Sequence, residues 1–112
     1  MTNYKLKDGL TEIGEFAFAR SNLSYADIPD GVKTIGYGAF YHCDKLENVV
    51  IPSSVTHIDK DAFSHTKWYE NWFENSEEAY LIVGDGVLIG YKGDAKDYQK
   101  PAGVKVVACE IP

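Results

Sequence analysis

The sequence has little cysteine, little positive charge and no long apolar run, and each shortage argues against a class of protein. Two cysteines among 112 residues are too few for a disulfide scaffold. No run approaches the ~18 apolar residues of a membrane span, and residues 1–7 lack the apolar stretch of a signal peptide. Eleven basic residues against 17 acidic ones give a net charge of −6, which disfavours nucleic-acid binding. The length and the hydrophobic fraction of 45% fit one globular domain over residues 1–112.

An internal repeat of 22 to 23 residues is visible in the first half of the chain. An Ile followed four residues later by Ala-Phe starts at Ile13, Ile35 and Ile58. A second motif, Ile-Pro-x-x-Val, keeps step with the first and starts at Ile28 and Ile51. A unit this short cannot bury its own apolar face, whereas stacked units can. The repeat therefore predicts a stack of similar units.

Each unit has a predicted local structure. Residues 46–51 alternate between inward and outward positions, and Pro52 follows them. This pattern predicts a strand that stops at the proline. The Ala-Phe pair is predicted to lie on a short helical segment with one buried face, which makes Phe40 a core residue. Gly14 and Gly36 indicate a backbone position that needs a positive φ or a close approach.

The repeat frame is interrupted after Phe63. A helix is predicted over residues 61–75, with one aromatic stripe made of Trp68, Tyr69, Trp72 and Phe73. Two apolar runs, 80–83 and 87–91, flank a Gly-Asp-Gly turn and predict a β-hairpin. The frame returns at residues 98–104. We therefore expect repeats over about 10–31, 32–54 and 55–103, with a helix and hairpin insertion over 64–97.

The full pattern, Leu-x-x-Val-x-Ile-Pro-x-x-Val-x-x-Ile-x-x-x-Ala-Phe, resembles the BspA-type leucine-rich repeat family. The resemblance covers residues 4–63 clearly and 80–107 in weaker form. It implies an α/β fold: a right-handed leucine-rich-repeat solenoid of about four coils with a short parallel sheet, interrupted by the helix and hairpin. Family members are typically secreted or surface proteins of bacteria and of some protist parasites. The resemblance thus implies an extracellular or cell-surface location and a role as an adhesin or interaction scaffold, not an enzyme.

Several histidines and aspartates are candidate metal ligands. His42 and His65 each lie two residues after a repeat Phe, and Arg20 completes their column. Zinc would need their nitrogens ~3.4 Å apart, whereas helical segments pack ~8–10 Å apart, so a solvated surface column is predicted. The aspartates that raise the question of calcium lack the spacing of an EF-hand loop; they are Asp59, Asp61 and Asp94. No metal and no cofactor is expected.

Cys43 follows His42, which raises the question of a catalytic dyad. Adjacent residues on a helix point ~100° apart, which is poor geometry for a nucleophile and its base. The resemblance implies instead that Cys43 fills a small buried position. A disulfide with Cys109 is not expected, because the two residues occupy different positions of the repeat. No catalytic residue is predicted.

The outward positions of the predicted strands form a candidate partner-binding sheet face. It comprises Lys5, Asp27, Glu47, Asn48, Val50 and Gln99. Four strands at ~4.8 Å and four residues at ~3.3 Å give only ~180 Å², against ~800 Å² per partner in a standard interface. The chain is therefore expected to act within a larger bacterial surface or secreted protein, in protein interaction or adhesion. The alternative is a carbohydrate-binding module that uses exposed aromatic residues; the burial of Trp68 and Trp72 separates the two.

The two ends of the sequence each cut a repeat, which suggests a piece of a longer array; the alternative is a short natural protein with degenerate caps. An uncapped stack exposes apolar side chains and unpaired strand edges. Weak self-association through these ends is therefore expected. The expected partner is an unknown protein or a host surface ligand. Neither nucleic-acid binding nor membrane insertion is expected.

Overall fold

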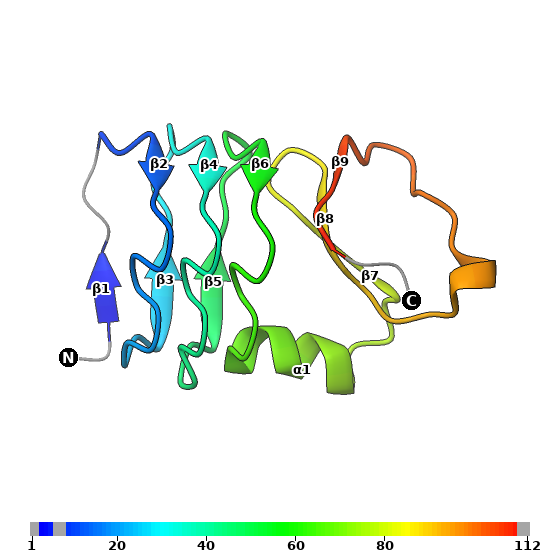
Figure 1. Ribbon diagram of the computed structural model, residues 1–112, viewed down its shortest axis with the longest axis horizontal. Coiled ribbons are helices and arrows are strands. Elements are labelled where there is room, and N and C mark those ends of the chain that lie inside the picture. Colours follow the sequence, from blue (N-terminus) through cyan, green and yellow to red (C-terminus); the bar gives the residue numbers. More distant parts are fainter. Residues whose placement is uncertain (1–2, 6–8, 110–112) are drawn as a thin grey trace.

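Two stacks of short parallel strands lie side by side in the first half of the molecule (Figure 1). The computed structural model describes residues 3–5 and 9–109. One sheet has the order β1-β3-β5 and the other has the order β2-β4-β6. Their strands are β1 (Asn3–Lys5), β2 (Glu12–Ile13), β3 (Tyr25–Asp27), β4 (Thr34–Ile35), β5 (Asn48–Val50) and β6 (His57–Ile58). Each repeat thus contributes one strand to each sheet, where the sequence predicted a single sheet.

The strands pair in the register of the sequence repeat. Ile13 lies opposite Ile35, and Ile35 lies opposite Ile58. These three side chains are at most 4% exposed. In the other sheet Ala26 lies opposite Val49, and both contribute to the core. Equivalent residues of successive repeats therefore contact each other, which confirms the predicted stacking of similar units.

After each strand of the sheet β2-β4-β6 the chain forms a turn segment, and we define the three segments as residues 15–20, 37–42 and 60–65. They are hydrogen-bonded turns and not the short helices that the spacing predicted. The reason is a left-handed backbone at two places in each segment, which a right-handed helix cannot contain. The residues are Phe16 and Arg20, Gly38 and His42, and Asp61 and His65, with φ between 54° and 62°.

Neither Gly14 nor Gly36 has the positive φ that the sequence offered as one explanation of these glycines. At Gly36 the requirement is close approach, because a Cβ would lie 2.9 Å from backbone atoms of Ile13, Gly14 and Glu15. A Cβ at Gly14 would meet nothing within 4 Å, since Gly14 lies on the first repeat. The prediction of a close approach is thus confirmed for Gly36. The left-handed backbone lies two residues later in each repeat, at Phe16 and Gly38.

The core is built around one column of phenylalanine rings. The ring of Phe40 stacks on Phe18 at 5.3 Å between centroids and on Phe63 at 5.2 Å. Phe40 is completely buried, as predicted. Trp68 continues the column, with its ring edge-on to Phe63 at 5.1 Å. The column therefore joins the repeats to the element that follows them.

That element is helix α1 (Lys67–Asn75), which begins six residues later than predicted. Thr66 caps its first turn: the Thr66 hydroxyl accepts from the Tyr69 N–H at 3.0 Å and donates to the Phe63 carbonyl at 2.8 Å. Residues 61–65 belong to the third turn segment, so the helix cannot start before the cap.

The predicted hairpin is confirmed as β7 (Tyr80–Val83) and β8 (Val87–Tyr91), which pair antiparallel. A third strand, β9 (Val106–Val107), pairs parallel with β8 and was not predicted. The short 3₁₀ helix η1 (Ala95–Asp97) lies in the connection between them. In Figure 1 β8 and β9 lie beyond β6, and the Asp85 N–H donates to the Val55 carbonyl at 2.8 Å. The hairpin therefore adds a strand next to the repeats before the chain returns to their frame.

Candidate functional site

The outer face of the sheet β1-β3-β5 carries two columns of side chains held in register. Lys5, Asp27 and Val50 lie opposite one another, which is the column that the sequence predicted. Asn48 and Val50 are exposed, and Asp27 is half-buried. For Lys5 the structure describes the backbone alone. Because Ala26 and Val49 point the other way, into the core, this face is one side of a regular sheet.

A second column and a charged edge extend this face beyond the predicted residues. Tyr25 lies opposite Asn48 in the adjacent position of the sheet. Glu47 pairs with Lys67 at the start of α1, with 3.1 Å between Oε1 and Nζ. Tyr25 could have been found from the sequence, because it precedes Ala26 as Asn48 precedes Val49. Lys67 could not, because its place depends on how α1 packs.

Gln99 does not belong to this face. It lies outside any strand, and its carbonyl accepts a hydrogen bond from the Tyr80 hydroxyl at 3.0 Å. The fourth strand that would have carried Gln99 is not formed among the described residues, where the sheet ends at β5. The Pro-x-x-Val turn of that fourth repeat does recur, since the Val104 N–H donates to the Pro101 carbonyl at 3.2 Å. The candidate face is therefore three strands wide.

His42 and His65 stack in adjacent repeats as predicted, but they lie on turn segments and not on helical segments. The rings of His42 and His65 are stacked, 4.3 Å apart and 4° from parallel. Arg20 lies over the Tyr41 ring at 5.9 Å. Stacked rings direct their nitrogens outward in parallel planes and not toward one ion. The described residues contain no group of three His, Cys, Asp or Glu side chains that could hold a metal ion.

Cys43 is completely buried, which agrees with the small buried position implied by the resemblance. Its thiol donates to the Phe18 carbonyl at 2.9 Å, and its sulfur lies 3.4 Å from the Ser21 hydroxyl. Cys109 is a free thiol as well, half-buried, and burial raises its pKa. A buried, hydrogen-bonded thiol and a thiol with a raised pKa are both poor nucleophiles.

The aromatic stripe of α1 faces the protein along most of its length. Trp72 is buried, and Trp68 packs on Phe63. Tyr69 packs on Trp72 at 5.4 Å. Phe73 is the exposed member, at 55%. The two tryptophans therefore do not form an exposed pair of rings on which a sugar could stack.

Lys92 fixes the position of α1 against the hairpin. Its Nζ donates to the carbonyls of Trp72 at 3.0 Å and Phe73 at 3.1 Å, and also to the Ser76 carbonyl. The same amine lies 5.1 Å from the centre of the Trp72 ring. A cation on the last carbonyls of a helix satisfies unpaired acceptors and complements the helix dipole.

Stacked copies of one backbone unit, joined by hydrogen bonds between equivalent residues, define a repeat protein. The chain belongs to the family described as BspA type leucine rich repeat region (6 copies), whose profile matches residues 1–80. No curated protein and no solved structure matches the chain. No helix among the described residues is long and apolar enough to cross a membrane.

Proposed function

We propose that the chain is a non-enzymatic scaffold whose outer sheet face binds a partner protein. The observation that carries the proposal is the register of the sheet β1-β3-β5, which fixes the exposed Asn48 and Val50 side chains beside Asp27 and Tyr25. A backbone already held by ladder hydrogen bonds loses little freedom when a partner binds, so more of the contact energy becomes affinity. Membership of a leucine-rich repeat family supports the same role.

The size of this face supports action as part of a larger array. Three strands at ~4.8 Å and three residues at ~3.3 Å span on the order of 100 Å², well below the ~800 Å² of a standard interface. We propose that further units extend the repeats as a right-handed solenoid, and that the array mediates adhesion at a bacterial cell surface. The family's association with bacterial surface proteins supports this setting.

A matched pair of variants tests the sheet face. Asn48→Arg adds a bulky cation on the face, and Asn75→Arg makes the same change at the exposed C-terminal end of α1. Beads carrying each chain are incubated with biotin-labelled surface proteins of epithelial cells. We expect proteins retained by the unchanged chain to be retained by Asn75→Arg and lost with Asn48→Arg. Equal retention by both variants would contradict the proposal.

Carbohydrate binding finds no support in the packing of Trp68 and Trp72, which contact Phe63 and Tyr69. A glycan array probed with the chain and with Phe73→Ala checks the exposed ring directly. Specific glycan binding lost in Phe73→Ala would favour the carbohydrate module over the protein scaffold.

We also propose weak self-association through the first repeat. Ala17 is exposed there, whereas its equivalents Ala39 and Ala62, which each follow an earlier repeat, are buried. An uncovered repeat end favours contact with another molecule. Sedimentation at several concentrations measures it, and Ala17→Lys should make the chain more strictly monomeric.

A further inference from the structure

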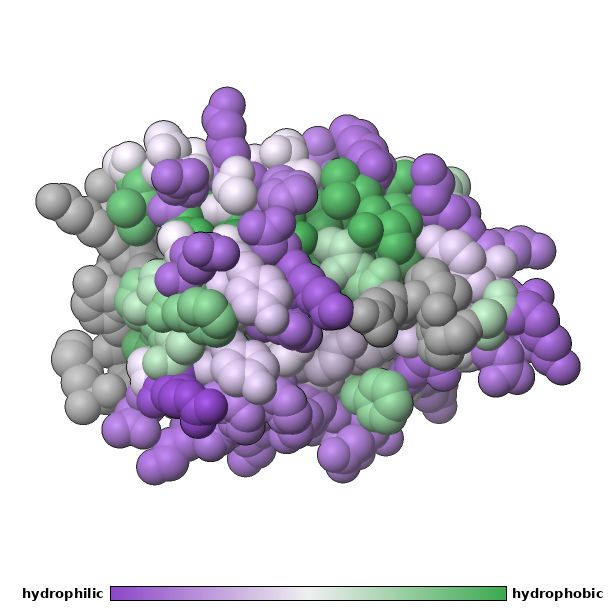
Figure 2. Space-filling model, in the orientation of Figure 1, coloured by the Kyte–Doolittle hydropathy of each residue, from purple (hydrophilic) through white to green (hydrophobic). Residues whose placement is uncertain are grey.

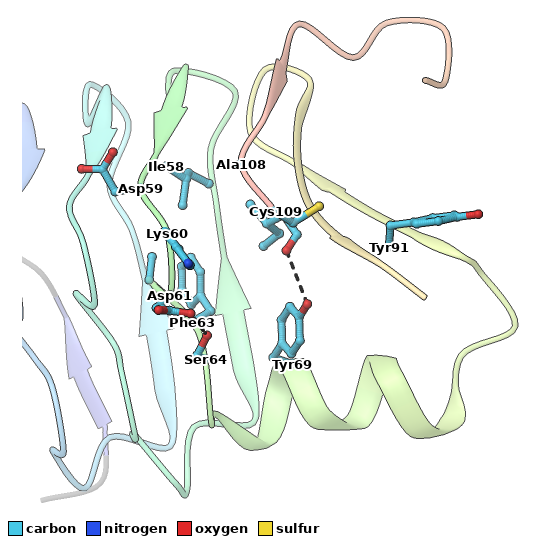
Figure 3. A pocket seen from close by; sticks show the side chains of 12 residues that line it. Ile58, Asp59, Lys60, Asp61, Phe63, Ser64, Tyr69, Tyr91, Ala108 and Cys109 are labelled. Atoms are coloured by element: carbon cyan, nitrogen blue, oxygen red, sulfur yellow. Dashed lines mark hydrogen bonds between the residues drawn. The ribbon is translucent and has the colours of Figure 1, made fainter. Parts of the chain in front are cut away.

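We propose that a cavity beside the third turn segment binds an extended peptide segment of a partner protein through the peptide's backbone carbonyls. The cavity has a volume of about 410 Å³. Its walls are residues 58–64, Tyr69 of α1, and Ile89, Tyr91, Ala108 and Cys109 (Figure 3). Figure 3 shows α1 below the cavity and the β8–β9 pair beside it. The inference does not depend on the sheet face.

The turn segments are joined by a regular ladder of backbone hydrogen bonds. In the first segment the N–H groups of Phe16, Phe18 and Arg20 donate to carbonyls of the second segment. In the second, the N–H groups of Gly38, Phe40 and His42 donate to Lys60, Ala62 and Ser64 of the third. These six bonds measure 2.7 to 3.3 Å. The alternate N–H groups bond within their own segment, so each segment offers three donors to the next unit.

The third segment has the same three donors with no acceptor. The N–H groups of Asp61, Phe63 and His65 bond to nothing among the described residues. Phe63 is 3% exposed, Asp61 is half-buried and His65 is exposed, so burial applies to the Phe63 donor first. Buried N–H groups in proteins are nearly always paired. Asp61 and Phe63 belong to the cavity wall, and His65 follows directly after it. A row of three donors that starts in a cavity wall indicates a site for a chain that brings three alternate carbonyls.

The walls define the chemistry of the peptide further. Trp68 already occupies the place that the next phenylalanine of the column would take, 5.1 Å from Phe63. A small residue is therefore required at that position. Equivalent positions of the repeat have a left-handed backbone at Gly38 and His42, with φ of 60° and 57°, so glycine suits the two flanking positions.

The acidic side chains of the wall are already engaged within the protein. Asp59 Oδ1 lies 2.6 Å from His57 Nε2, and Asp61 Oδ1 accepts from the Ser64 hydroxyl at 2.9 Å. These contacts direct the two carboxylates to the protein itself, which favours backbone carbonyls over a cationic ligand.

The probe is the peptide acetyl-Ala-Gly-Ala-Ala-Ser-Gly-Ala-amide, titrated to about 5 mM into the ¹⁵N-labelled chain. We expect selective shifts of the Asp61, Phe63 and His65 amides and about tenfold slower hydrogen exchange at these three when the site is filled. A second peptide with Phe in place of the central Ala should bind at least about tenfold more weakly, because Trp68 occupies that space.

Two variants of the protein complete the test. Ala108→Leu fills the cavity from its wall and should abolish the shifts, whereas Ala102→Leu, on an exposed position before β9, should preserve them. Three outcomes would overturn the proposal: no selective shift, equal binding to Ala108→Leu, or strong exchange protection of the three amides without peptide. The last result would mean that this chain's own end or a second copy fills the cavity. Loss of the exchange protection on dilution would identify the second copy.

Discussion

The ring of Trp72 fills the space in which a side chain at Gly90 would stand. A Cβ at Gly90 would lie 2.8 Å from two ring atoms of Trp72 and 2.9 Å from the Tyr69 hydroxyl. Helix α1 can therefore pack on strand β8 only because position 90 has no side chain. This contact positions the helix that closes one side of the cavity shown in Figure 3.

Gly90→Ala should destabilise the protein by about 1–3 kcal/mol, because the tryptophan ring must shift within a packed interface. Gly14→Ala is the matched control, since a Cβ there has no neighbour within 4 Å and its φ is not positive. That control should change stability by less than about 1 kcal/mol. Urea melts of the two variants measure the difference, and equal midpoints would show that α1 does not rest on Gly90.

Phe40→Ala should destabilise by about 3–5 kcal/mol, because it removes a fully buried ring that stacks on Phe18 and Phe63. In a stack of repeats no remote contact compensates for the loss. Phe73→Ala, on an exposed ring, should cost less than about 1 kcal/mol. A loss below about 1 kcal/mol for Phe40→Ala would mean that the inward face of the repeat is misassigned.

Lys92→Met should destabilise by about 1.5–3 kcal/mol, since it removes charged hydrogen bonds to the last carbonyls of α1. Methionine keeps the apolar stem that packs beside Trp72. Lys96→Met, on an exposed residue of η1, removes the same charge without that contact. Thermal melts with far-ultraviolet circular dichroism compare the two, and similar melting temperatures would exclude the capping role.

The sequence predicted what depends on periodicity and missed what depends on a single backbone conformation. The Ile13, Ile35 and Ile58 column and the hairpin followed from spacing and turn residues. The turn segments did not, because residues such as Phe16 and Arg20 give no signal for the left-handed backbone that they adopt. The pairing of β9 with β8 and the free donors of the third turn segment arise from long-range packing, which no local pattern encodes.

The two cysteines should react with iodoacetamide very differently. Cys43 is buried and hydrogen-bonded to the Phe18 carbonyl, so it should remain unlabelled until the protein unfolds. Cys109 is half-buried, and burial raises the pKa of its thiol. The thiolate is the reactive form, so at pH 8 Cys109 should label more slowly than cysteine in a short peptide. Its rate should also keep rising at pH values where the peptide's rate has levelled off. Mass spectrometry of Cys43→Ser and Cys109→Ser assigns each label, and rapid native labelling of Cys43 would contradict the buried site.

Tyr69 should make the protein less stable at alkaline pH. Burial raises the pKa of the Tyr69 hydroxyl above its ordinary value of about 10, and the charges of Cys109 and Asp61 raise it further. Above that ordinary value the unfolded chain loses this proton while the folded chain keeps it. The unfolded state then binds fewer protons, so the free energy of unfolding decreases as pH rises through this range and stops decreasing above the folded pKa.

Tyr69→Phe should remove this pH dependence at little cost near neutral pH, because within residues 3–5 and 9–109 the hydroxyl makes a single, long hydrogen bond of 3.5 Å to the Ile89 carbonyl. At pH 7 the variant should lie within about 1 kcal/mol of the unchanged chain. Between about pH 9 and 11 its stability relative to the unchanged chain should rise steadily. The Cys109→Ser background removes the thiol's own contribution, since its pKa is raised too. Urea melts across this pH range provide the measurement, and parallel stability curves for the two chains would show that Tyr69 keeps no proton beyond the unfolded state.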